Sequence, residues 1–144
     1  MILSLLSTET MALVQRSLDA AALSHKVISD NLANVDTPGF KRSEVVFASK
    51  LREAMDARTK SGEKLDAMRT DPGHLAFSKA PLVDEVQPMV VQMNDTTMRN
   101  DGNNVDIDNE MAKLAQNTIL YTALAQVTQQ QFSGLRSAIF EGRR

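Results

Sequence analysis

The chain has 144 residues, of which 42% are hydrophobic and only 4% aromatic, and its formal net charge is −2. This near-neutral balance excludes the strongly basic surface that nucleic acids and anionic membranes attract, so neither is an expected partner. The absence of cysteine excludes disulfides, thiolate metal sites and cysteine nucleophiles.

The amino-terminal stretch, MILSLLSTETM, lacks the features of a cleaved signal peptide. It has no Lys or Arg before Arg16, and its apolar run from Ile2 to Leu6 is interrupted by Ser4. No segment approaches the ~20 consecutive apolar residues of a membrane span. We therefore expect a chain that is soluble when synthesised and is not exported by the general secretory route.

A long amphipathic helix is predicted from about Thr8 to Val35. Thr8 suits the N-cap and Glu9 the first turn, where the helix dipole favours an acid. Apolar positions alternate three and four residues apart, which is the heptad spacing of a helix that packs along another helix. This amino-terminal seam consists of Met11, Val14, Leu18, Ala21, Ile28, Leu32 and Val35, with His25 at the remaining position.

The helix runs into a definite turn within the segment NLANVDTPGFKR, residues 31–42. Pro38 disfavours helical geometry at the residue before it, so the helix should end just upstream. Gly39 accepts a positive φ at little steric cost, and Asn34 or Asp36 can bond nearby backbone amides. The turn should therefore fix the direction in which the chain leaves the helix.

Residues 43–106 lack the regular apolar spacing of the two ends. A short helix is expected within residues 50–65, ended by Gly62, and a strand within residues 83–93, where Pro88 restricts it to the edge of a sheet. A polar, turn-rich stretch follows. We expect much of this middle segment to be flexible in the free chain.

The second long helix is predicted from about Asp108 to Phe140. Asp108 suits its N-cap and Glu110 its first turn, while Arg136 lies near the far end and Gly142 is a natural stop. The apolar spacing again alternates between four and three residues. This carboxy-terminal seam consists of Met111, Leu114, Tyr121, Ala125, Phe132, Leu135 and Ile139, with Ile107, Thr118 and Thr128 completing the alternation.

These features predict a mainly α-helical fold in which two long terminal helices with coiled-coil-like seams pack together. A variable, partly extended or disordered middle segment joins them. The expected organisation is a first helix (1–36), a turn motif with the flexible middle (37–107) and a second helix (108–144). A two-helix hairpin leaves apolar side stripes such as Leu120, Leu124 and Val127 partly exposed, and these favour association with other chains.

Three segments resemble bacterial flagellar rod and hook proteins. NLANVDTPGFKR is similar to their N-L-A-N-x-x-T-x-G-[FY]-[KR] signature, GNNVDIDNEMAKLAQNTILYTALAQV (102–127) is similar to the stretch preceding the last helix of the proximal rod proteins, and TDPGHL (70–75) resembles a short motif of that subgroup. Together they resemble the B type of small proximal rod protein, with the C type as the alternative. The signature turn comprises Asn31, Leu32, Ala33, Asn34, Thr37, Pro38, Gly39, Phe40 and Lys41.

The resemblance implies a non-enzymatic structural subunit of the proximal rod, the tubular drive shaft that transmits torque in the flagellar basal body. Both terminal helices would pack together and beside neighbouring subunits, nearly along the rod axis. The implied partners are further copies of the chain, other rod proteins, the adaptor that joins the rod to the membrane ring, and the flagellar type III export apparatus. That apparatus would deliver the chain to the periplasmic rod without a cleaved signal peptide, and no cofactor is implied.

Two rival interpretations remain open. One is a soluble helical adaptor or chaperone whose seam takes a partner helix. The other is an enzyme that uses His74 and Asp71, although no pocket motif accompanies them. We also expect residues 1–10 to become ordered only on assembly.

A metal site is not expected. His25 occupies a seam position, where a histidine usually packs among polar neighbours. The run Asp101, Asn103, Asp106 and Asp108 resembles a calcium loop, but Gly102 is out of register and the twelfth-position Glu is missing. The run should instead form a turn that leads to the capped second helix, and no small-molecule substrate is expected.

Overall fold

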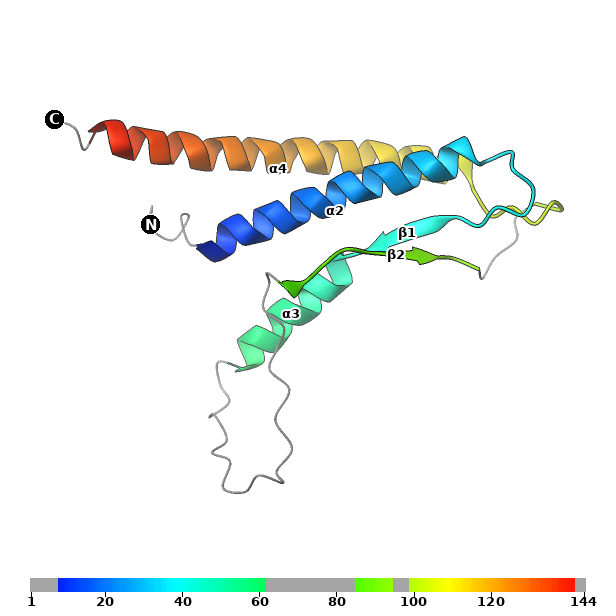
Figure 1. Ribbon diagram of the computed structural model, residues 1–144, viewed down its shortest axis with the longest axis horizontal. Helices are drawn as coiled ribbons and strands as arrows, with labels where there is room; N and C mark the ends of the chain where they lie inside the picture. The colour runs from blue at the N-terminus through cyan, green and yellow to red at the C-terminus, as the bar shows by residue number, and fades with distance from the viewer. Residues whose placement is uncertain (1–7, 62–84, 95–98, 142–144) are drawn as a thin grey trace, which may run out of the picture.

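Two long helices, a shorter helix and a short two-stranded sheet make up the described part of the protein. The computed structural model describes residues 8–61, 85–94 and 99–141. In chain order its elements are α2 (Thr8–Ala33), β1 (Ser43–Val46), α3 (Ala48–Ser61), β2 (Met89–Gln92) and α4 (Ile107–Glu141). The mainly helical fold with paired terminal helices is confirmed (Figure 1).

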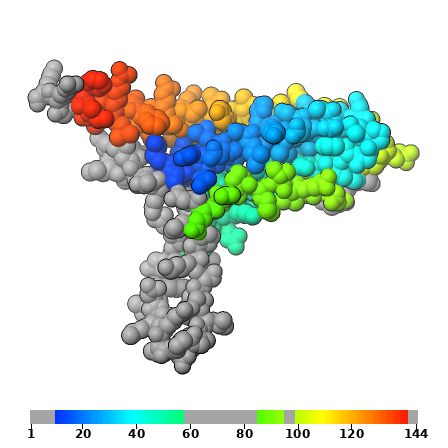
Figure 2. All heavy atoms as spheres, viewed as in Figure 1, coloured from blue at the N-terminus to red at the C-terminus, as the bar shows by residue number. Residues whose placement is uncertain are grey.

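The helices α2 and α4 lie side by side and run in opposite directions (Figure 1). The first and last residues predicted for each helix from its apolar spacing lie within two residues of the observed ones. Val14, Ala21 and Ile28 of α2 are buried, and they recur every seven residues, as heptad packing requires. Figure 2 shows α4, coloured yellow to red, along one outer edge of the molecule. Among the described residues, no helix is both long and apolar enough to cross a membrane.

The start of α4 differs from the sequence-based prediction, because Asp106 is its N-cap and not Asp108. The Asp106 carboxylate accepts hydrogen bonds from the backbone N–H of Asp108 at 3.0 Å and of Asn109 at 3.4 Å. Its carbonyl oxygen accepts the first helical bond, from the N–H of Glu110 at 2.9 Å. Asp108 therefore lies inside the first turn, where an acid still suits the helix dipole.

The strands β1 and β2 pair antiparallel, with Ser43 opposite Gln92 and Val46 opposite Met89. A strand within residues 83–93 was predicted, and β2 confirms it. The partner strand β1 was not predicted, since SEVV is short and follows the turn directly.

A small apolar cluster holds α3 against the rest of the chain. It joins Ala20 of α2, Phe47, Ala54 of α3 and Val86, with Leu51 packed beside it. The predicted short middle helix is confirmed by α3 (Ala48–Ser61), and the role expected of Gly62 lies outside the described residues. The expectations for residues 1–7 and 62–84 lie outside the described residues.

Candidate functional site

The turn after α2 is held from a distance by the loop that precedes α4. Within the turn, the N–H of Thr37 donates to the carbonyl of Asn34 at 3.1 Å, and Gly39 adopts a φ of 73°. The positive φ predicted for Gly39 is confirmed. The Gly39 N–H then donates to the carbonyl of Asp101 at 2.9 Å, and Lys41 Nζ donates to the carbonyl of Gly102 at 2.7 Å.

Asn103 is the central residue of this contact, and it is fully buried. Its Nδ2 donates to three carbonyl oxygens of the turn that follows α2: Asn34 at 3.0 Å, Val35 at 2.9 Å and Thr37 at 3.0 Å. These carbonyls follow the last turn of α2, so no further turn of helix supplies their partners. One side-chain amide thus satisfies the carbonyls at which the chain leaves α2.

Arg99 adds a charged contact to the same place. Its Nη1 donates to the carbonyl of Val35 at 2.9 Å and forms an ion pair with Asp36 at 3.3 Å. The side chain of Asn34 bonds locally: its Nδ2 donates to the carbonyl of Asp30, and its Oδ1 accepts from the Thr37 hydroxyl. The expectation that Asn34 or Asp36 would bond backbone amides is therefore wrong, because carbonyls, a hydroxyl and a guanidinium are their partners.

Asn31, the first residue of the signature, connects α2 to β1 and α4 and is buried. Its Oδ1 accepts from the N–H of Ser43 at 2.9 Å, and its Nδ2 donates to the carbonyl of Ser43 at 2.8 Å and to Glu110 Oε2 at 2.9 Å. The side-chain amide therefore pairs with the free edge of β1 as a peptide group of another strand would.

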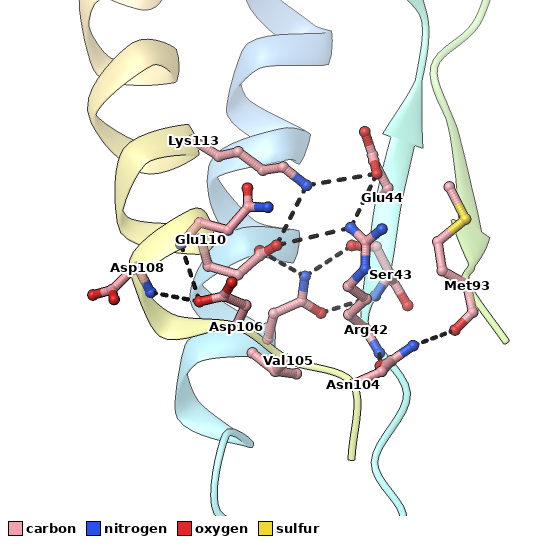
Figure 3. Close-up of polar contacts among 12 residues, drawn as sticks. Arg42, Ser43, Glu44, Met93, Asn104, Val105, Asp106, Asp108, Glu110 and Lys113 are labelled. Carbon is pink, nitrogen blue, oxygen red and sulfur yellow. Dashed lines mark hydrogen bonds and ion pairs between the residues drawn. The ribbon is translucent and has the colours of Figure 1, made fainter. Parts of the chain in front are cut away.

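The side-chain amide of Asn104 also takes the place of a peptide group, here between the residues Arg42 and Met93 that flank the two strands (Figure 3). Met93 N–H donates directly to the carbonyl of Arg42 at 2.9 Å. The reciprocal bond passes through Asn104, whose Oδ1 accepts from the Arg42 N–H and whose Nδ2 donates to the Met93 carbonyl, both at 2.7 Å. The amide of Asn104 thus extends the ladder by one pair.

A group of charges surrounds the buried carboxylate of Glu110, which is 2% exposed. Lys113 Nζ lies 3.4 Å and Arg42 Nη1 4.0 Å from its Oε1, and both cations also contact Glu44, at 3.6 and 3.2 Å respectively. A buried carboxylate needs such partners, since an unpaired charge in the interior is strongly destabilising. We call Asn31, Arg42, Ser43, Arg99, Asn103, Asn104 and Glu110 the clasp.

Most clasp residues were missed by sequence reasoning. The segment containing Asn103 and Asn104 was singled out, but no role was assigned to either side chain, and Glu110 was placed only in the first turn of α4. The paired asparagines before a capped helix were the available signal, because such residues often bond nearby backbone groups.

The two predicted seams occupy different environments. In the amino-terminal seam Val14, Ala21 and Ile28 are buried and Met11, Leu18, Leu32 and Val35 half-buried, whereas in the carboxy-terminal seam Leu114 and Leu135 are half-buried and Met111, Tyr121, Ala125, Phe132 and Ile139 exposed. His25, expected at a seam position among polar neighbours, is exposed. Whether these residues serve as assembly surfaces stays a prediction.

The calcium-like run is occupied by structural bonds. Asp101 Oδ1 accepts from the Asn103 N–H, and Asn103 Oδ1 accepts from the Val105 N–H. Asp106 caps α4. Within the described ranges, no three His, Cys, Asp or Glu side chains gather as a metal site would require. His74 and Asp71 lie outside the described residues.

Replacing Gly39 by Val should destabilise the fold by about 1–3 kcal/mol, because a β-branched residue is strained at this φ. A Cβ would meet no atom within 4 Å, so the loss is attributed to backbone strain and not to a Cβ clash. Thermal unfolding followed by circular dichroism measures it. Gly134→Ala, in the interior of α4, is the control and should gain about 0.5–1 kcal/mol. Equal unfolding temperatures for Gly39→Val and the parent would contradict this account.

The described fold is that of an α-helical protein built on two antiparallel terminal helices, with the exit turn of the first helix fixed by buried polar side chains. Residues 13–41 match the family model described as flagella basal body rod protein. The chain is 39% identical to flagellar basal body rod protein FlgB of Borreliella burgdorferi, over 83% of this chain and 87% of the relative.

Two other relatives bear the same name. The chain is 34% identical to FlgB of Bacillus subtilis, over 93% of this chain and 95% of the relative, and 27% identical to FlgB of Escherichia coli, over 89% and 91%. The chain therefore belongs to the flagellar basal body rod protein FlgB family. The resemblance to the B type is confirmed.

Proposed function

We propose that the chain is a structural subunit of the flagellar proximal rod that assembles through its terminal helices. The observation that carries the proposal is the surface of α4. From Leu114 to Leu135 the sequence contains no Asp, Glu, Lys, Arg or His. A solvated helix surface normally carries charges, so an uncharged surface of this length suits enclosure by other chains.

Exposed apolar side chains lie along this helix. Met111 is 48% exposed, Phe132 56% and Ile139 71%, and all three belong to the predicted carboxy-terminal seam. The opposite helix differs, because the outer positions of α2 include Asp19, Lys26 and Asp30. We infer that the exposed seam of α4 packs against neighbouring subunits.

The clasp suits this role because every copy must direct its middle segment in the same way. Identical contacts repeated by one symmetry operation require identical subunit geometry. The clasp sets the exit from α2 through buried hydrogen bonds, and it would do so in each copy. We infer that Gly39→Val, besides its cost in stability, abolishes rod assembly while leaving synthesis intact.

The remaining parts of the proposal follow from the family. We infer that the chain is not an enzyme, that it contacts copies of itself, other rod proteins and the adaptor at the membrane ring, and that the flagellar type III apparatus exports it without a cleaved signal. The decisive experiment is purification of hook–basal bodies, with mass spectrometry and labelled-antibody electron microscopy. Absence of the chain from the particle, with recovery as a soluble complex with one partner, would favour the helical adaptor instead.

Replacing Phe132 and Ile139 together by Ser should abolish swimming. Burying two such side chains contributes about 3–6 kcal/mol, which is at least ~100-fold in an assembly equilibrium. The control replaces Gln126 and Gln130 by Ser, since these exposed residues lie on another side of α4. Motility in soft agar and counts of basal bodies are the measurements. Normal swimming by the Phe132/Ile139 variant would remove this seam from the proposal.

A further inference from the structure

The residues of α4 that lie deepest in the described structure are all polar. Glu110, Asn117 and Gln131 are the three buried residues of the helix, whereas its large apolar residues are half-buried or exposed. They are spaced by seven and fourteen residues, so they lie on one line along α4. We call this line, which faces α2, the polar line.

Two of the three residues have a specific partner on α2. Asn117 Nδ2 donates to the carbonyl of Ala21 at 2.9 Å. Glu110 Oε2 accepts from Asn31 Nδ2 at 2.9 Å. The third, Gln131, has a buried Oε1 with no hydrogen-bond partner.

An apolar helix laid on the polar line would bury these groups without partners. Unpaired buried amides and carboxylates disfavour such a complex, and a polar residue at a core position is a known means of selecting one helix partner over another. The helix α2 satisfies two of the three groups. A second α4 that laid its apolar seam, with Phe132 and Ile139, on this line would satisfy none of them.

We propose that Glu110, Asn117 and Gln131 are specificity-determining residues that reserve the polar line for the chain's own α2. The exposed apolar seam of α4 is thereby left as the surface that neighbouring chains can cover. The role of the neighbours rests on the proposed rod function, but the selection of α2 is a property of the free chain.

The natural absence of cysteine allows a direct test. Leu124 lies on the polar line, seven residues from both Asn117 and Gln131, and Ala125 lies on the exposed seam. Single cysteines are placed by Leu124→Cys or Ala125→Cys, in the parent chain and in an Asn117→Leu/Gln131→Leu background. The rate of covalent dimer formation is then measured under mild oxidation.

We expect the Leu124→Cys dimer to form at least about tenfold faster in the Leu background. The two polar lines meet in this dimer, and polar residues at the core of a helix pair lower its stability relative to leucines. The Ala125→Cys rate should not change. Gln116→Leu/Gln130→Leu adds the same two leucines at exposed positions, and it should leave the Leu124→Cys rate unchanged. If the double variant loses its helical circular dichroism signal, Asn117→Leu alone is used as the background for the same rate comparison.

An unchanged Leu124→Cys rate in the Leu background would overturn the proposal. So would an equal rise for Ala125→Cys, since that result indicates general adhesion. Failure of the rod function would be recognised separately, by absence of the chain from purified basal bodies, and it would leave the dimer rates as they are.

Discussion

Replacing Asn103 by Asp is expected to destabilise the folded chain by about 3–5 kcal/mol, which is a large part of the stability of a small protein. The side chain is fully buried, and its Nδ2 is the donor to three carbonyl oxygens of the turn. An aspartate offers no donor there, and its charge would face the negative ends of three carbonyl dipoles. The turn would lose its principal contact with the loop before α4.

Urea unfolding followed by circular dichroism measures this loss. Asn109→Asp is the matched control, because it makes the same chemical change at an exposed position in the first turn of α4. A carboxylate is favoured there, so its effect should stay within about 0.5 kcal/mol. If Asn103→Asp were as stable as Asn109→Asp, the clasp would not be what holds the turn.

The helices and the turn could be read from local sequence. Heptad spacing identified α2 and α4, and Pro38 and Gly39 marked the turn, because each of these signals depends on residues only a few positions apart. The N-cap of α4 shows the limit of local signals. In the sequence, Asp106 and Asp108 are equally good candidates for the N-cap. Only the folded backbone shows that Asp106 accepts the capping bonds.

The clasp could not be predicted because its bonds connect distant parts of the chain. Asn103 bonds to carbonyls 66 to 69 residues away, and Asn31 bonds to Glu110 across 79 residues. An asparagine in the sequence carries no mark of the carbonyl it will meet. The strand β1 was also missed. It is only four residues long, and its partner β2 lies more than forty residues away in the sequence.

The face of α4 that meets α2 was also beyond sequence reasoning. Hydrophobic periodicity detects the most apolar line of a helix, and it selected the seam that contains Met111 and Phe132. The line that faces α2 is polar, and it is recognisable only once Ala21 and Asn31 are seen to supply its partners. Apolar periodicity therefore finds surfaces that need cover without showing which chain covers them.

Replacing Asn31 by Asp should be nearly as damaging as the change at Asn103, at about 3–5 kcal/mol. The side chain is 1% exposed, and as aspartate it could no longer donate to the Ser43 carbonyl or to Glu110 Oε2, 2.8 and 2.9 Å away. It would also bring a second carboxylate against the buried one. The repulsion between the two like charges can be separated from the lost donor by a second substitution.

Glu110→Gln supplies that separation. In the Asn31→Asp/Glu110→Gln variant the new amide at position 110 can donate to the new carboxylate at position 31. Arg42 and Lys113 then still have one carboxylate nearby. The Ser43 carbonyl, however, still lacks its donor. We therefore expect the double variant to recover about half of the loss, with a coupling energy of about 1–3 kcal/mol in the unfolding free energies. Asp30→Asn, at an exposed position on the preceding residue, is the control and should stay within about 0.5 kcal/mol. Strictly additive losses for Asn31→Asp and Glu110→Gln would show that the two side chains do not act on each other, and the link from α2 to α4 would then have to rest on Asn117.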